Sequence, residues 1–308
     1  MNDQTLRLTN AEPLPVQDRR LAHVEIFEDL THAEPYWRAI EDGLATPYQR
    51  YDFLRLWQQH VGEPAGVTPF IVVGLNAARA PLFLCPFGRR WIGRLRVAEF
   101  LGGTHVNFNM ALWRCDVAPQ IDAAELRHMF ACLRGKVDLI CLSNQPLTWE
   151  GATNPFALLA HQRAANSGFS GTLVPDFAAL LRARTNAATR KKMRKKEHAL
   201  AELGVVTFAS ASSAAATRQV LDVFFKQKNT RMRALGIADV FAQPGVRRFI
   251  EAAASEPTLA GERLIELCAL SVNDIVVATM GGIVGGGRFC AMFNSIAQGR
   301  YAIESPGE

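Results

Sequence analysis

The stretch that most constrains the fold is residues 262–308, where three apolar runs are separated by two turn signals. The runs cover residues 264–270, 275–283 and 289–296, and the turns fall at 272–274 and 285–287. Apolar runs of this length bounded by Asn, Asp and Gly predict strands joined by hairpins. We therefore expect a three-stranded antiparallel meander whose third strand is an open edge unless further chain covers it.

The first half of the chain repeats the same order of elements. The apolar pattern of each half predicts a short strand, two helices and then a three-stranded meander. In the first half these elements are expected at 23–27, 33–40, 48–60, 69–75, 81–87 and 92–101. In the second half the strand and the two helices are expected at 205–208, 214–233 and 246–254.

The first half also continues beyond its meander. A helix is expected at 123–134, a strand at 137–142 and a further helix at 155–166. Comparison of the halves then predicts a missing helix and strand after Glu308. The expected fold class is α/β (α+β), with two tandem units, each a mixed and mostly antiparallel sheet flanked by helices. We expect a flexible leader at 1–20, one unit at 21–180 and an incomplete, truncated unit at 181–308.

Composition narrows the class of protein. Hydrophobic residues make up 49% and charged residues 20%, which is ordinary for a globular domain. No window reaches about 18 uncharged apolar residues, and the first 20 residues do not resemble a signal peptide. The six cysteines are widely spaced without a C-x-x-C pair, which indicates reduced thiols. A cytoplasmic protein without a membrane span and without a metal site is expected.

The charge is concentrated in one stretch. Eight basic residues lie within 182–196, more than the net charge of +5 for the whole chain, so the remainder is net acidic. These residues are Arg182, Arg184, Arg190, Lys191, Lys192, Arg194, Lys195 and Lys196. They belong to a helix expected at 187–203, interpreted as a solvated linker or as a surface for phosphate groups. Few aromatic residues interleave the lysines, so nucleic acid is not a favoured partner.

Five stretches, in order, carry a family resemblance. They are 46–57 (TPYQRYDFLRLW), 138–142 with 154–156, 190–200 (RKKMRKKEHAL), 227–231 (QKNTR) with Gly236 and Phe241, and 305–307 (SPG). Together they resemble the GNAT acyltransferase fold, doubled as in the Fem-type aminoacyltransferases. The chain is most similar to the acetyltransferase family typified by the CelD cellulose-biosynthesis proteins.

The resemblance implies an acyl-CoA-dependent N- or O-acyltransferase that uses acetyl-CoA. Its acceptor would be a small molecule or glycan, such as a sugar or polysaccharide intermediate. Ser305, Pro306 and Gly307 would bind the cofactor. Ser305 could cap a helix, proline is tolerated in a first helical turn, and Gly307 leaves room for a phosphate near backbone N–H groups.

Candidates for the chemistry are few. Glu266, Tyr301 and Glu304 are the catalytic candidates that the meander and its following loop can supply. A basic helix face with Lys226, Lys228, Arg231 and Arg233 is either plain surface or a binding site for an acidic or sugar substrate. His105, Asn107 and Asn109 occupy the corresponding loop of the first unit, which lacks a glycine run. That unit is interpreted as a scaffold that has lost cofactor binding, with His105 structural.

Two other functions stay open. A Fem-type transferase would take its acyl group from aminoacyl-tRNA, which the basic stretch favours. A non-catalytic accessory protein or truncated remnant would need no complete cofactor site. The sequence does not decide the acceptor, the acyl group, the catalytic base or the oligomeric state.

Overall fold

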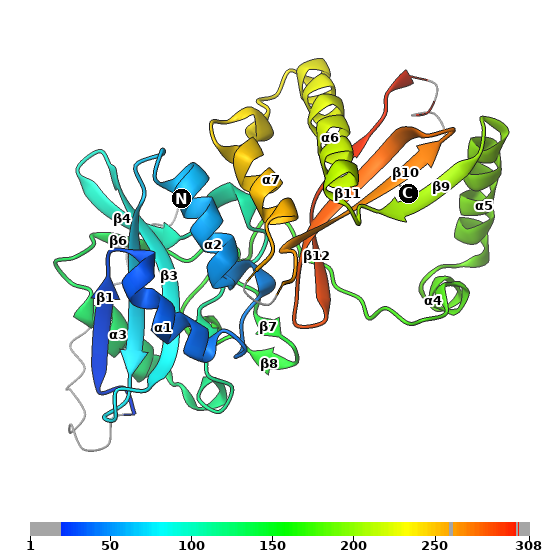
Figure 1. The fold of residues 1–308 in the computed structure, drawn as a ribbon. Helices are drawn as coiled ribbons and strands as arrows, with labels where there is room; N and C mark the ends of the chain where they lie inside the picture. The colour runs from blue at the N-terminus through cyan, green and yellow to red at the C-terminus, as the bar shows by residue number, and fades with distance from the viewer. Residues whose placement is uncertain (1–19, 259–260, 300, 302–308) are drawn as a thin grey trace, which may run out of the picture.

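The computed structural model describes residues 20–258, 261–299 and 301. It contains two mixed α/β units that lie side by side and are joined by an extended segment (Figure 1). The expected fold class is confirmed, because each unit has a largely antiparallel sheet flanked by helices.

The first unit is built on a sheet of strand order β1-β2-β3-β4-β6, with β5 paired to β3. All pairs are antiparallel except β4 and β6, which run parallel. Its elements are β1 (His23–Phe27), α1 (Leu30–Ile40), η2 (Pro47–Gln49), α2 (Tyr51–Trp57), η3 (Gln58–Gly62), β2 (Thr68–Leu75), β3 (Pro81–Ile92), β4 (Leu95–Phe100), β5 (Leu112–Trp113), α3 (Ala123–Cys132) and β6 (Leu139–Cys141). A small hairpin of β7 (Thr148–Trp149) and β8 (Ala152–Thr153) follows.

Both faces of this sheet are covered, because side chains along a strand alternate between its two sides. On β2, Ile71 and Val73 belong to the cluster that contains α1 and α2. Phe70 and Val72 belong to the cluster that contains α3. This double burial explains why β2 reads as a continuous apolar run.

The second unit has a fully antiparallel sheet of order β12-β11-β10-β9. Two helices cover one face, and α5 packs on part of the other through Leu200 and Leu203. The elements are α4 (Phe177–Arg184), α5 (Ala187–Glu202), β9 (Val206–Ser210), α6 (Ala214–Leu235), α7 (Val246–Ser255), β10 (Ile265–Val272), β11 (Ile275–Gly285) and β12 (Arg288–Ile296). The order β9-α6-α7-β10-β11-β12 repeats β1-α1-α2-β2-β3-β4, as the sequence predicts.

The two units share one hydrophobic cluster. Phe53 on α2 meets Phe249 on α7 edge to face, with ring centroids 5.1 Å apart. The start of α7 also approaches η3 closely, since a Cβ built on Gly245 would lie 1.7 Å from the carbonyl oxygen of His60. Gly245 has φ of 80°, so this contact needs glycine for both its space and its backbone conformation. The units therefore form one folded body with a continuous core.

Three local expectations are wrong. The helix expected at 155–166 is only the short turn η6 (Pro155–Leu158), and α4, which the sequence did not predict, follows later. Ile92 ends β3 instead of starting the next strand, because Gly93 takes a positive φ of 60° and makes the turn there. The proposed boundary between residues 180 and 181 falls inside α4.

Candidate functional site

Strand β12, at the edge of the described part of the second sheet, contains a β-bulge. Gly281 pairs with Phe293 while Gly282 pairs with Ala291, so Met292 is one extra residue on β12. A bulge bends its strand and redirects backbone and side-chain groups, and bulges are enriched beside active sites. This end of β12 is therefore a candidate position for the active site of the second unit.

Glu266 lies in the row of directly paired residues that crosses β10, β11 and β12 and ends at this bulge. It pairs with Gly282 on β11, which in turn pairs with Ala291 on β12. Directly paired residues share a face, and Glu266 is exposed whereas its neighbours Ile265 and Leu267 are buried toward the helices. The carboxylate thus lies on the face opposite α6 and α7, two strands from the bulge.

The other catalytic candidates are not brought to this row. Tyr301 is buried in a cluster with Leu200, Val272 and Val277, where α5 meets the sheet. From Glu266 to Val272, β10 rises roughly 20 Å, so Tyr301 packs near the other end of the strand. Glu304, Ser305, Pro306 and Gly307 lie outside the described residues.

The basic candidates on α6 are exposed side chains. Lys226, Arg231 and Arg233 all face solvent and do not line the cavity described below. Lys228, in the same stretch, donates from Nζ to the Asn294 carbonyl at 3.3 Å and lies over the Phe241 ring. Burial, followed by the charge of Arg231, lowers the pKa of Lys228 below its usual value. Lys228 thus links α6 to β12 through this hydrogen bond.

The residue before Lys228 makes a second attachment to the sheet. Gln227 donates to the Val276 carbonyl at 3.1 Å and accepts from the Ser295 hydroxyl at 2.7 Å. The Ser295 and Thr279 hydroxyls are 2.7 Å apart and buried. Buried polar groups in a satisfied network fix one packing arrangement. The QKNTR stretch therefore positions β12 against α6.

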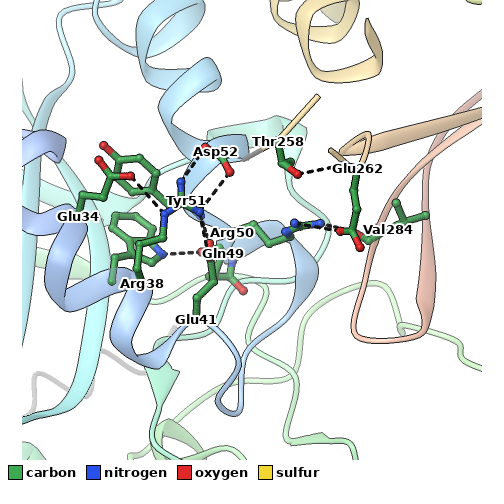
Figure 2. A network of polar contacts seen from close by, with 11 residues as sticks. Glu34, Arg38, Glu41, Gln49, Arg50, Tyr51, Asp52, Thr258, Glu262 and Val284 are labelled. Carbon is green, nitrogen blue, oxygen red and sulfur yellow. Dashed lines mark hydrogen bonds and ion pairs between the residues drawn. The ribbon is translucent and has the colours of Figure 1, made fainter. Parts of the chain in front are cut away.

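A polar cavity of about 460 Å³ lies where the two units meet. Residues 41–43, 45–47, 49, 50 and 150 line it from the first unit, and Glu262, Gly285 and Gly286 line it from the second. Arg50 crosses between the units, donating to the Val284 carbonyl at 3.2 Å and approaching Glu262 at 3.4 Å (Figure 2). Gly285 is roughly 10 Å along β11 from Gly282, so the cavity and the Glu266 row share one end of the sheet.

An ion-pair network holds the wall of this cavity in place. Arg38 on α1 donates to Asp52 at 2.8 and 3.1 Å and to Glu41 at 2.9 Å, as Figure 2 shows. Its guanidinium lies 4.5 Å from the centroid of the Tyr51 ring. Burial alone would lower the pKa of Arg38, but the hydrogen bonds that it donates to Asp52 and Glu41 outweigh burial and raise that pKa. Glu41 also accepts from the Tyr51 backbone N–H at 2.5 Å, which closes the loop of residues 41–51.

The loop of the first unit that follows β4 contacts the bulge region of the second unit. Asn107 donates from Nδ2 to the Ala291 carbonyl at 2.8 Å and to the Tyr48 hydroxyl at 3.3 Å. Asn109 bonds through its backbone N–H to the Asn144 carbonyl at 2.9 Å, so the same loop fills the space beside the end of β6. The Asn107 contact joins the two units, whereas the Asn109 contact stays within the first unit.

His105, in that loop, is held in the core. Its Nδ1 accepts from Trp57 Nε1 at 3.1 Å, and its buried Nε2 has no hydrogen-bond partner among the described groups. Burial lowers the pKa of His105, which keeps the ring neutral. These surroundings indicate a structural residue.

The stability of the protein is expected to fall as the pH drops below about 6.5, partly through His105. The unfolded chain then binds a proton on this ring that the folded chain does not, so acid favours unfolding. Urea titrations between neutral pH and about pH 5 should show a smaller acid loss in His105→Gln than in the wild-type protein. His198→Gln, on the exposed face of α5, is the matched control and should keep the wild-type slope.

Neither a metal-ligand cluster nor a membrane-spanning helix is present in the described residues. Within residues 20–258, 261–299 and 301, no group of three or more His, Cys, Asp or Glu side chains is arranged to hold a metal ion. In the same part of the chain, the helices are too short or too polar to cross a bilayer.

The sequence of the second unit matches a known family model. Residues 187–308 match the model of the acetyltransferase (GNAT) domain, so this part of the chain is similar to that domain. The match begins with α5 and covers β9 to β12, the elements that carry the bulge and Glu266. The first unit lies outside the match.

Comparison with solved structures gives only distant likeness. A conserved protein of unknown function from Bacteroides thetaiotaomicron VPI-5482 is 12% identical, with a TM-score of 0.46, over 91% of this chain and 84% of that chain. A fungal multi-domain GH3 β-N-acetylglucosaminidase with a GCN5-related glucosamine N-acetyltransferase region is 11% identical, with a TM-score of 0.25, over 84% of this chain and 27% of that chain. No curated protein matches the sequence.

Proposed function

We propose that the protein is an acyl-CoA-dependent N- or O-acyltransferase that transfers an acetyl group. The acetyltransferase domain match over residues 187–308 carries this proposal. The bulged strand β12 and the exposed Glu266 in its row support it. The resemblance to the CelD family favours a sugar or polysaccharide intermediate as the acceptor.

The described residues fit such a donor in one respect. Strand β12 lies at the edge of the described part of its sheet, and an edge presents backbone N–H and C=O groups to an extended ligand. The pantetheine arm of CoA contains amides that could pair with such an edge. Ser305, Pro306 and Gly307 stay proposed as residues that bind the pyrophosphate.

Glu266 is proposed as the general base. In the transfer, the acceptor nitrogen or oxygen forms a bond to the thioester carbonyl carbon as its proton passes to the Glu266 carboxylate. The carbon–sulfur bond then breaks and CoA leaves as the thiolate. Catalysis here consists of positioning and proton transfer, so a carboxylate on an exposed face in the same row as the bulge is suited to the role.

The full-length protein is expected to release CoA thiol from acetyl-CoA when glucosamine is supplied as a probe acceptor. Glu266→Gln should lower kcat about a hundred-fold, because a general base contributes on that order, while acetyl-CoA binding measured by calorimetry stays unchanged. Glu256→Gln, an exposed glutamate at the end of α7, is the control and should keep the wild-type rate.

The outcomes separate the parts of the proposal. A wild-type rate in Glu266→Gln would remove Glu266 from the mechanism and leave the acyltransferase proposal standing. Absence of acetyl-CoA binding by the wild-type protein would reject the proposal itself. Turnover with aminoacyl-tRNA in place of acetyl-CoA would identify the Fem-type alternative.

A further inference from the structure

The segment that leads into the second unit presents exposed apolar side chains. Phe169 and Leu173 are 91% and 78% exposed, and Val174 and Phe177 are exposed as well. Large apolar side chains gathered in one short segment, instead of scattered singly, mark an interaction surface.

Basic side chains follow directly on α4 and α5. Between residues 169 and 196 there are eight basic residues and a single acidic one, Asp176. Arg184, Lys191, Arg194 and Lys195 are among those exposed to solvent. Together with Leu173, Val174 and Phe177 they form what we call the α4–α5 patch.

The local structure fixes the two parts of the patch near one another. Asp176 caps α4 and Asn186 caps α5, each by accepting from a backbone N–H in the first turn. Arg190 on α5 donates to the Thr185 carbonyl in the turn between the helices. Figure 1 shows α4 beside the N-terminal end of α5, on the side of the second unit away from the first. The other end of α5 is held on the sheet through Leu200.

We propose that the α4–α5 patch binds the surface of an anionic lipid bilayer. Stable attachment to a membrane surface takes two signals, apolar groups that insert and basic groups that meet acidic headgroups, and this patch supplies both. The partner is thus a bilayer with acidic phospholipids, bound peripherally.

Other partners fit the patch less well. Nucleic acid would satisfy the charge, but Leu173 and Val174 have no ring face on which a base could stack. A second copy of the chain would satisfy the apolar side chains, but it would bring two strongly positive patches together. Of these three partners, the lipid surface is the one that uses the charges and the aliphatic side chains at once.

The test is co-sedimentation of the full-length protein with vesicles. Binding is expected to vesicles of equimolar phosphatidylcholine and phosphatidylserine, to be absent with phosphatidylcholine alone, and to weaken as salt is added. Lys191→Glu/Arg194→Glu/Lys195→Glu should lower the partition coefficient about a hundred-fold or more, because each basic residue at such a surface contributes about five-fold. Leu173→Ser/Phe177→Ser should lower it about ten-fold or more through lost insertion.

The matched control is Arg127→Glu/Arg134→Glu/Lys136→Glu, three exposed basic residues of the first unit, and it should sediment like the wild-type protein. An equal loss of vesicle binding in the control would show that binding depends only on the net charge of the protein, and it would overturn the proposal. Failure of the wild-type protein to bind the acidic vesicles would also overturn it. So would binding to labelled RNA that the α4–α5 charge reversals abolish while vesicle binding is absent.

Discussion

Replacing Arg38 with methionine is expected to lower the free energy of unfolding by about 3 kcal/mol. The guanidinium is shared by Asp52, Glu41 and Glu34, and Asp52 is buried. Without Arg38, the Asp52 and Glu41 carboxylates stay close together with little solvent and no countercharge, which raises the energy of the folded state. Urea denaturation monitored by circular dichroism measures the loss.

Two comparisons test the cause of this loss. Arg114→Met removes an exposed pair with Asp116 and should cost less than about 1 kcal/mol. Arg38→Met/Asp52→Asn should recover part of the stability, because one of the unpaired charges is then gone. A cost for Arg38→Met no larger than that for Arg114→Met would show that the network does not stabilise the fold.

Replacing Phe249 with alanine is expected to cost about 4 kcal/mol and to destabilise both units together. The Phe249 ring is fully buried and packs against Phe53 of the other unit. Because the core is continuous, calorimetry of the wild-type protein should give one unfolding transition, and the variant should give one transition at lower temperature.

Phe289→Ala is the matched control, since Phe289 is partly exposed on β12, and it should cost less than about 1 kcal/mol. Two separate transitions in the wild-type protein, with only one of them moved by Phe249→Ala, would contradict a shared core. That result would mean that the contact between α2 and α7 contributes little to stability.

Much of the fold was predictable because the sequence signals for strands and turns are local. Asn273 and Asp274 take positive φ in one hairpin, and Gly286 and Gly287 do so in the other, where the sequence places turns. The helix expected at 155–166 shows the limit of such reasoning. Asn154 caps and Pro155 opens a helical turn, but residues 160–166 are all exposed and gain no packing that could extend it.

The candidate site was predictable only in part. Glu266 stays a prediction that rests on the clear pattern of its strand, and its row with Ala291 depends on register across three strands. The cavity was not predictable, because Arg50 and Glu262 are 212 residues apart in sequence. Arg38 has a helical partner in Glu34, but its contact with Asp52 exists only in the folded chain.

The bond from Asn107 to the Ala291 carbonyl has a consequence for how a protein of two units changes over generations. The first unit lies outside the match to the acetyltransferase domain, so its residues need not be under the same constraint as those of the second unit. Here the loop of the first unit touches the backbone beside the bulge of the second, so its shape affects the neighbouring strand. Inherited changes in the first half are therefore constrained by the needs of the second, and the halves must vary together.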